Sequence, residues 1–215
     1  MNQQEIQNLR QDYTAATLSE KDTKGDPINQ FEQWFNEALA AKLHEPNAMT
    51  LATATTSGKP SARIVLLKGF NQSGFIFYTN YLSRKGKEIT KNPQGAITFF
   101  WGELERQVRI EGTIEKLSKE DSERYFHSRP KGSQIGAVVS PQSQEIDSRD
   151  GLEKKWNELE AEYTDKEVPK PSFWGGYILN PQLVEFWQGR SSRLHDRILY
   201  KKIDKKTWKK VRLAP

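Results

Sequence analysis

The N-terminal part of the chain carries the clearest repeat of apolar and polar positions. Between residues 28 and 43, apolar side chains recur every three or four positions, as they do along one face of an α-helix. These side chains belong to Ile28, Phe31, Trp34, Phe35, Leu39 and Leu43. Asp26-Pro27 before this run and Glu45-Pro46 after it are typical start and stop signals. The pattern therefore predicts an amphipathic helix over residues 28–43.

Short runs rich in β-branched and aromatic residues follow that helix, separated by turn-forming clusters such as Ser57-Gly58-Lys59-Pro60. These runs predict strands over residues 48–55, 61–70, 75–80, 95–102, 106–117, 174–180, 183–189, 197–203 and 207–213. Strands joined by short connections form antiparallel sheets of the meander or Greek-key kind. So many strands in a chain of this length predict a barrel with helices packed on its outside.

Three further helices are predicted between these strands. Their spans are residues 83–92, 118–129 and 148–163. Ser83 and Ser118 stand where a side-chain oxygen caps the free N–H groups of a helix, and Pro93 and Pro130 stop the first two helices. The run at residues 134–140 is short and apolar.

Composition narrows the class of protein. The chain has 215 residues, of which 35% are hydrophobic and 11% aromatic, so it is able to bury a core. It has no cysteine, which excludes disulfides, thiolate catalysis and thiolate metal sites. No apolar run approaches the roughly 18 residues that span a bilayer, and the first residues lack the apolar core of a signal peptide. We therefore expect a cytoplasmic protein that does not enter membranes.

Positive charge is concentrated at the C-terminal end. The net charge is +5, but residues 188–215 hold ten Lys and Arg against Asp196 and Asp204, a net +8, so residues 1–187 carry −3. A nucleic-acid-binding protein usually has a broader basic face. A locally basic end fits a small anionic ligand at least as well.

Familiar motifs are missing from the sequence. It contains no Rossmann or P-loop glycine pattern, no His-Glu-x-x-His zinc motif and no Gly-x-Ser-x-Gly nucleophile elbow. Three scattered histidines argue against a metal site. What remains is a set of separate phosphate-binding candidates together with aromatic residues, which favours a phosphorylated, flat cofactor and a phosphorylated substrate.

Two segments place cations at positions that suit an anion. Arg84 and Lys85 follow the predicted cap Ser83, so they lie in a first helical turn that already carries partial positive charge. A phosphate there would satisfy both cations and the free N–H groups. In the strand at residues 61–70, Arg63 and Lys68 stand at the ends of opposite faces. In each case the alternative is a basic side chain that simply reaches solvent.

Two later segments have the same character. Tyr125 and Arg129 share a helix face, with Ser133 just beyond, and together they offer several phosphate donors. If residues 190–202 are extended, Arg193, His195 and Arg197 share one face and Asp196 lies on the other. The alternatives are a surface Tyr–Arg pair and a solvated edge strand. Arg190, Lys201 and Lys202 are predicted to belong to such an edge.

Eleven short motifs, in order along the chain, resemble the pyridoxine/pyridoxamine 5′-phosphate oxidase family. They are RIVLLK (63–68), FYTN (77–80), SRKG (83–86), ERQVRIEG (105–112), YFHSRP (125–130), SQIGA (133–137), PQSQ (141–144), PSFWGGY (171–177), EFWQG (185–189), RLHDR (193–197) and RLAP (212–215). Each motif alone is weak evidence. Eleven in register are very specific.

The resemblance implies a mainly β (α+β) fold, an antiparallel Greek-key FMN-binding split β-barrel with flanking helices. It implies a homodimer with FMN at the subunit interface, and a single domain over residues 1–215. It also implies oxidation of pyridoxine 5′-phosphate or pyridoxamine 5′-phosphate to pyridoxal 5′-phosphate. Oxygen is then the acceptor, H2O2 is released, and the amine substrate also yields NH3. No nucleic acid, membrane or metal takes part.

The resemblance also implies roles for particular residues. The FMN contacts are Arg63, Ile64, Val65, Leu66, Leu67, Lys68, Tyr78, Thr79, Arg84, Lys85, Gln107, Gln142, Ser143, Trp187 and Arg197. The substrate contacts are Lys68, Tyr125, Arg129 and Ser133 on the phosphate, with Arg193, Leu194 and His195 near the reacting carbon. Arg193 and His195 are the catalytic candidates, although an arginine is protonated at ordinary pH and suits positioning better than proton removal. Arg197 is expected near the pyrimidine end of the flavin, where negative charge develops on reduction.

Residues 1–20 are expected to be a mobile substrate lid and residues 21–47 a helical preface. Relatives carry an Arg-x-x-Tyr motif in the lid, which reads Arg10-Gln-Asp-Tyr13 here, with less basic residues at its centre. Two other readings stay open. A split-barrel flavin reductase or another FMN-binding protein leaves the cluster of Tyr125, Arg129 and Ser133 unexplained. A nucleic-acid-binding or anion-binding module predicts salt-sensitive oligonucleotide binding and no flavin.

Overall fold

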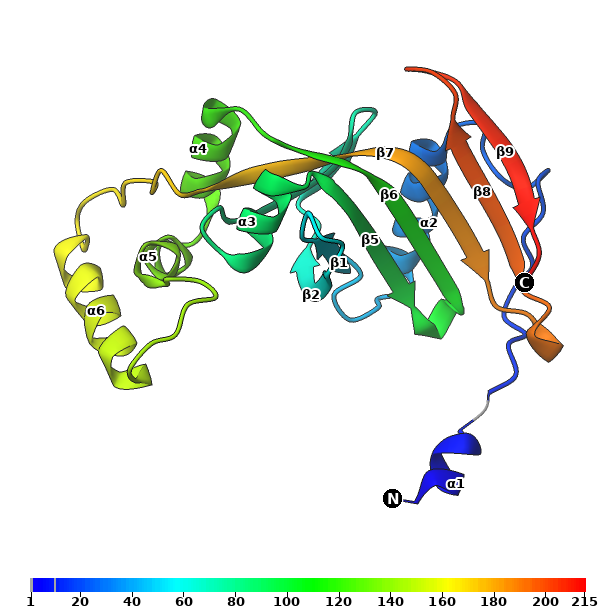
Figure 1. Ribbon diagram of the computed structural model, residues 1–215, viewed down its shortest axis with the longest axis horizontal. Coiled ribbons are helices and arrows are strands. Elements are labelled where there is room, and N and C mark those ends of the chain that lie inside the picture. Colours follow the sequence, from blue (N-terminus) through cyan, green and yellow to red (C-terminus); the bar gives the residue numbers. More distant parts are fainter. Residues whose placement is uncertain (1, 10) are drawn as a thin grey trace. The chain divides into compact units, whose positions relative to one another are not determined.

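A computed structural model describes residues 2–9 and 11–215 of the chain, which form helices and strands (Figure 1). The helices are α1 (Gln3–Gln7), α2 (Pro27–Ala40), α3 (Arg84–Lys91), α4 (Lys119–Ser128), α5 (Lys131–Val139) and α6 (Arg149–Glu162). The strands are β1 (Ala48–Ala54), β2 (Pro60–Leu66), β3 (Gly69–Asn71), β4 (Gly74–Asn80), β5 (Gln94–Trp101), β6 (Arg106–Lys116), β7 (Trp174–Gln188), β8 (Asp196–Lys202) and β9 (Trp208–Leu213). Short 3-10 turns lie at Gly102–Leu104 and Ser191–Arg193. Most of the predicted elements are confirmed, with modest shifts of their ends.

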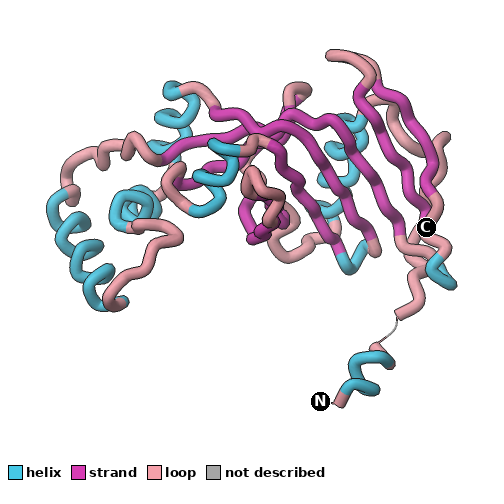
Figure 2. Tube along the Cα trace, viewed as in Figure 1, coloured by secondary structure: helices cyan, strands magenta, loops and turns pink. Residues whose placement is uncertain are grey.

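A nine-stranded sheet joins the strands (Figure 2). Its order is β2-β1-β5-β6-β7-β4-β3, and β8 pairs with β7 and with β9. β7 is antiparallel to β4 from Trp174 to Leu179 and antiparallel to β8 from Leu183 to Gln188. The predicted antiparallel sheet is confirmed.

Two predictions of where strands begin and end were wrong. The strand predicted over residues 61–70 ends at Leu66, because β2 lies beside β1 whereas the following β3 pairs with β4. Conversely, the strands predicted at 174–180 and 183–189 form the single strand β7. Pro181 interrupts the sequence pattern, but it falls between the β4 and β8 registers, where its missing N–H removes no hydrogen bond from either of them.

The described residues form two compact units that interleave along the chain. The first unit takes its residues from the ranges 1–50, 97–111 and 181–215, and the second from 51–96 and 112–180. Several strands run from one unit into the other, so these units are not successive domains, and a single domain over residues 1–215 stays a prediction. No helix in the described part of the chain is long and apolar enough to cross a membrane.

Helix α2 supplies the core of the first unit with aromatic side chains. Asp26 caps the helix by accepting from the backbone N–H of Ile28 at 2.8 Å, as the start signal predicts. Phe31 packs on Phe99 with ring centroids 5.1 Å apart, and Trp34 meets Phe186 edge-on at 5.1 Å. The helix ends at Ala40, before the predicted Leu43.

The core of the second unit joins helices to the first half of β7. Phe126 of α4, Ile135 of α5, Val168 and Trp174 form a buried cluster. The short apolar run at residues 134–140 therefore belongs mainly to helix α5. Trp174 stands at the beginning of β7, and this position brings its ring to the predicted phosphate residues of α4.

Candidate functional site

The predicted ligand-binding residues fall into two groups, one in each unit. In the second unit, a cavity of about 290 Å³ draws its walls from β2, β4, α3, α4, the loop after α5 and the start of β7; we call it the Lys85 cavity. It is lined by Ile64, Val65, Leu66, Lys68, Tyr78, Thr79, Lys85, Tyr125, Arg129, Gln142 and Trp174. Every lining residue except Trp174 was predicted to contact FMN or substrate. The structure thus brings these side chains together from distant parts of the sequence.

Lys85 is a buried cation at the start of α3. Ser83 caps this helix, as predicted, and accepts from the N–H of Gly86 at 3.3 Å. The Lys85 ammonium donates to Gln142 Oε1 at 2.7 Å and to Thr79 Oγ1 at 3.3 Å, both neutral oxygens. Burial, with a smaller effect of the positive charge of Arg63, lowers the pKa of Lys85 to about 8. An anion in the Lys85 cavity would relieve this cost.

Arg84 and Lys85, the two cations of the predicted anion site, line different cavities. The Arg84 side chain is exposed and its Nε donates to Glu88 Oε1 at 2.9 Å. It lines another cavity of about 410 Å³, together with Ser143 and Glu88. Consecutive helical residues point about 100° apart, which explains why the two cations reach different cavities.

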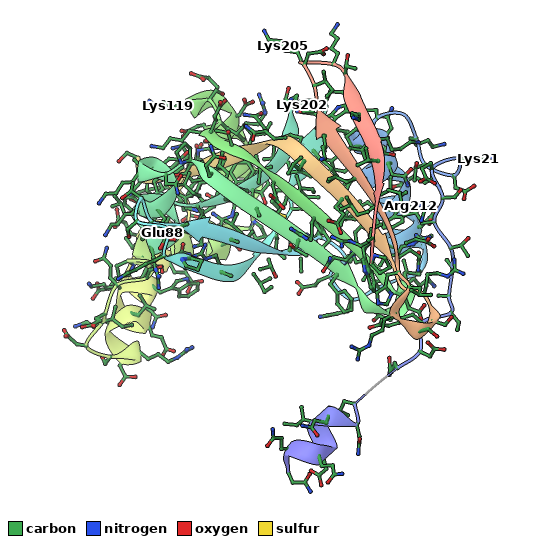
Figure 3. All side chains as sticks on the ribbon, turned by 45° about the vertical axis from the view of Figure 1, so that its right-hand side comes forward. Lys21, Glu88, Lys119, Lys202, Lys205 and Arg212 are labelled. Carbon is green, nitrogen blue, oxygen red and sulfur yellow. The ribbon has the colours of Figure 1, made fainter. Side chains whose placement is uncertain are left out.

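Arg63 belongs to a polar network within the second unit and does not simply reach solvent. Its guanidinium donates to Thr53 Oγ1 and Ser61 Oγ, each at 2.5 Å. Glu88 (labelled in Figure 3) accepts from the same two hydroxyl groups. Burial alone would raise the pKa of Glu88, but the hydrogen bonds from Ser61, Thr53 and Arg84 lower it to about 2. Glu88 therefore stays charged and fixes Arg63.

Aromatic rings form one wall of the Lys85 cavity. Tyr78 stacks on Tyr125 with ring centroids 3.8 Å apart, and both rings lie nearly parallel to that of Trp174. A Cβ on Gly176 would lie 2.8 Å from the Tyr78 ring, so only glycine permits this stack. Trp174 was not predicted as a site residue, although it lies in the PSFWGGY motif.

Arg129 lies beside this aromatic wall and carries a hydrogen-bond donor that has no partner among the described residues. Helix α4 ends at Ser128, so Arg129 is its C-cap, one residue beyond the predicted helix face. The Arg129 guanidinium lies 4.6 Å from the Trp174 ring centroid, and its Nη2 donates to the carbonyl of Ser133 at 2.8 Å. Its Nη1 is buried without a hydrogen-bond partner in the described part of the chain. A buried unpaired donor costs about 1–3 kcal/mol, so this atom suits an anionic oxygen.

The second group lies in the first unit around a cavity of about 590 Å³, which we call the His195 cavity. It is lined by Leu9, Gln11, Asp12, Tyr13, Arg190, Ser192, Arg193 and His195. The His195 ring lies 4.6 Å from that of Trp187 and 5.8 Å from that of Tyr13, centroid to centroid. The predicted Arg10 lies outside the described residues.

Arg193 and His195 reach the His195 cavity from a turn, so the prediction of a shared strand face was wrong. Ser191–Arg193 is a 3-10 turn, Arg193 has φ of 60°, and β8 begins only at Asp196. His195 Nδ1 accepts from the backbone N–H of Arg190 at 3.1 Å. A neutral His195 ring therefore carries its proton on Nε2.

Carboxylates pair with three arginines of the basic C-terminal end. Arg197 is held by Glu185, and Asp196 accepts from Arg190 at 3.0 Å and from Arg212 at 2.7 Å. Arg212 (labelled in Figure 3) also pairs with Glu20 at 2.9 Å. The interpretation of Arg190 as part of a solvated edge was therefore wrong, since it is ion-paired and lines the His195 cavity.

The remaining predicted residues lie outside the two cavities. Leu67 is buried after β2, Gln107 is half-buried on β6, and Leu194 is exposed. Sequence reasoning missed Glu88 and Glu185, buried carboxylates that hold predicted site arginines. For Glu185, a charged residue within the otherwise apolar stretch 183–187 was the available signal, whereas Glu88 lies in a mostly polar helix that gives no such signal. Among the described residues, no cluster of His, Asp or Glu fits a metal ion.

Comparisons with known proteins give consistent results. The family described as pyridoxamine 5′-phosphate oxidase matches residues 35–163, and the pyridoxine 5′-phosphate oxidase C-terminal dimerisation region matches residues 174–215. Two curated relatives are named pyridoxine/pyridoxamine 5′-phosphate oxidase. The one from Salinibacter ruber is 57% identical, covering 98% of this chain and 99% of its own. The one from Rubrobacter xylanophilus is 55% identical, covering 98% and 97%.

Solved structures share the fold. PhzG from Burkholderia lata, in complex with tetrahydrophenazine-1-carboxylic acid, has a TM-score of 0.88 at 32% identity, covering 94% of this chain and 99% of its own. A pyridoxamine 5′-phosphate oxidase-related, FMN-binding protein from Nostoc punctiforme has a TM-score of 0.69 at 18% identity, covering 86% and 97%. With the antiparallel sheet and flanking helices, these likenesses confirm the predicted fold class.

Burial of Lys85 predicts a pH-dependent stability of the ligand-free protein. The pKa of Lys85 is about 8 in the folded state, below its ordinary value of 10.5. Below pH 8 both states hold the proton and the cost of the buried charge is complete. Between these two values the unfolded chain binds more protons, so stability rises with pH. We expect Lys85→Met to stabilise the protein most below pH 8, with the gain shrinking toward pH 10.5.

Urea unfolding across this pH range measures the difference in free energy between the variant and the unchanged protein. Lys87→Met, on the exposed side of the same helix, controls for the loss of one positive charge. A gain from Lys85→Met that stays constant across the range contradicts the prediction.

Proposed function

The chain belongs to the pyridoxamine 5′-phosphate oxidase family, and we propose that it is an FMN-dependent oxidase that makes pyridoxal 5′-phosphate. Its substrates are pyridoxine 5′-phosphate and pyridoxamine 5′-phosphate. Oxygen accepts two electrons and two protons to give H2O2, and the amine substrate also takes up water and releases NH3. The observation that carries the proposal is the similarity to named oxidases along nearly the whole of both chains.

The Lys85 cavity supports FMN as the cofactor. Within the described part of the chain, its buried ammonium has only neutral oxygen partners, so the cavity suits a phosphorylated ligand. We propose that FMN reaches both cavities, so that its phosphate lies between Lys85 of one cavity and Arg84 of the other, with Arg63, Ser143 and the Thr79–Gln142 pair nearby. FMN, when bound, supplies the two-electron acceptor that protein side chains lack. The protein's own part is to bind the cofactor and orient it.

Arg129 supports a second phosphate position, for the substrate. Its Nη1 is a buried donor with no partner among the described residues, and a phosphate oxygen would satisfy it. Lys68 and Tyr125 line the same cavity, and Ser133 fixes the guanidinium through its carbonyl. We propose that these four residues bind the substrate phosphate. A flavin reductase would not need this second phosphate position.

Arg193 and His195 are proposed to orient the substrate carbon that is oxidised. A guanidinium stays protonated at ordinary pH, so Arg193 acts by holding the substrate and not by removing a proton. The hydrogen bond from Arg190 leaves His195 Nε2 as a donor toward the His195 cavity. Tyr13, which packs on Trp187 and His195, is the described member of the Arg10–Tyr13 pair in the proposed N-terminal lid.

The chain carries the family's dimerisation region, and we propose that each active site takes residues from both subunits of a homodimer. That region covers residues 174–215 and therefore includes Trp187, Arg193, His195 and Arg197. We propose that these residues complete the site built around the partner's Lys85 cavity. FMN then lies at the subunit interface.

The first test is direct. We expect the purified protein to be yellow and to form H2O2 from pyridoxine 5′-phosphate, because an FMN oxidase passes the electrons of each turnover to oxygen. Absorbance spectra and a coupled peroxidase assay measure the two properties. A protein that stays colourless with added FMN and binds oligonucleotides in a salt-sensitive manner would instead fit an anion-binding module.

Arg129→Gln tests the substrate phosphate position. Loss of charge-assisted hydrogen bonds of about 1.5–3 kcal/mol should raise KM for pyridoxine 5′-phosphate by roughly ten- to a hundredfold. FMN binding should change little. Arg124→Gln is the matched control, because Arg124 lies on the same helix and is exposed. An unchanged KM for Arg129→Gln, measured by steady-state peroxide formation, rules out this role.

Mixing two impaired variants, assayed at a substrate concentration far below the raised KM of Arg129→Gln, tests whether subunits share the site. Arg129→Gln and Arg193→Leu each damage every site in their own homodimer. In a randomly reassembled mixture, half of the dimers carry both variants, and each such dimer has one intact site if the residues come from different subunits. About a quarter of the original activity should then return. Activity that stays at the level of the separate variants means that both residues serve the site from one chain.

A further inference from the structure

Glu185 is a buried carboxylate that the proposed mechanism does not use. It lies on β7, with a side chain that is 7% exposed, and faces the guanidinium of Arg197 on β8. Arg197 Nε donates to Glu185 Oε1 at 2.9 Å and Nη2 donates to Oε2 at 3.1 Å. Two parallel hydrogen bonds of this kind fix both the position and the plane of a guanidinium.

A third hydrogen bond completes the hold on Arg197. Its Nη1 donates to the carbonyl of Ala214 at 2.9 Å. An arginine has five N–H groups, so one N–H on each terminal nitrogen remains for a ligand. The orientation of these two donors is therefore set by protein contacts before any ligand binds.

The other charges beside Glu185 are more exposed. Arg109 Nη1 lies 3.5 Å from Glu185 Oε2, and Arg109 Nη2 donates to Glu111 Oε1 at 2.8 Å. The side chains of Arg109 and Glu111 are each 43% exposed, so solvent screens their charges. The close, shielded partner of Arg197 is thus Glu185. The negative charge of Glu185 therefore partly offsets the positive charge that Arg197 presents to a ligand.

We propose that Glu185 is a positioning residue of the oxidase that also sets the reduction potential of its cofactor. The inference rests on the proposed function, in which Arg197 lies beside the flavin. The flavin ring gains negative charge on reduction, and a nearby cation stabilises that form. By offsetting part of the Arg197 charge, Glu185 keeps the midpoint potential lower than an unpaired arginine would set it. A lower potential favours the transfer of electrons from the reduced cofactor to oxygen.

Glu185→Gln removes the negative charge of this side chain but nearly keeps its size and shape. The glutamine oxygen still accepts a hydrogen bond from Arg197, but the negative charge is lost. We expect the midpoint potential of the FMN-loaded enzyme to rise, and reoxidation of the reduced enzyme by oxygen to slow. A reference dye in redox equilibrium with the enzyme measures the potential, and stopped-flow absorbance measures reoxidation. A purely structural role for Glu185 predicts no rise in potential when FMN occupancy is complete.

Two further variants isolate the effect. Glu185→Asp keeps the charge but shortens the side chain, so the potential should stay near its original value while the FMN dissociation constant rises several-fold. Glu111→Gln removes an equal charge at the exposed end of the same cluster and should leave both quantities unchanged. Peroxide formation by the unchanged protein is measured first, because its failure would overturn the proposed function instead.

The midpoint potentials of the two Glu185 variants test this role of Glu185. A potential that is unchanged or lowered in Glu185→Gln, at full FMN occupancy, overturns it. If Glu185→Gln holds no FMN, Glu185→Asp decides the matter. A potential near the original value, with weakened FMN binding, supports the inference, whereas a displaced potential despite the retained charge overturns it.

Discussion

The site depends on positive charge that is buried without an internal counter-charge. The Lys85 ammonium meets only the oxygens of Thr79 and Gln142, and Arg129 Nη1 meets no acceptor among the described residues. A folded chain keeps such groups only where other interactions hold them in place. Here the caps and aromatic packing of α3, α4 and β7 do so. The phosphorylated ligand that we propose for this site would therefore meet donors that are already oriented and dehydrated.

Two other arginines of the proposed site are, in contrast, each paired with a buried carboxylate. Glu88 accompanies Arg63, and Glu185 accompanies Arg197. In both pairs a buried carboxylate holds the guanidinium from behind, so these arginines have fixed orientations and a reduced net charge. The protein thus combines unpaired cations, which suit ligand phosphates, with paired cations, which suit a ring whose charge changes during reaction. This division requires neither a metal nor a cysteine.

Much of this arrangement is predictable from the sequence, because it follows local rules. The caps at Asp26, Ser83 and Ser118 were correctly predicted, since each depends on residues within one helical turn. Long-range partners were not predictable in this way. Pro181 resembled a strand break, but its neighbours pair with different strands on either side. The turn at Ser191–Arg193 resembled a strand, because alternation does not reveal the positive φ of Arg193. Glu20 is 192 residues from Arg212, so only the fold reveals that the basic end is partly neutralised.

The interleaving of the two units has a consequence for synthesis of the chain on the ribosome. The first unit joins its early residues to its last ones, since Leu18 donates to Asp196 and Glu20 pairs with Arg212. Leu18 and Glu20 therefore lack these partners until β8 and β9 have left the exit tunnel. Most residues of the second unit emerge earlier and are able to pack first. Chain growth thus imposes an order of assembly, in which the elements of the first unit that carry His195 and Arg197 are completed last.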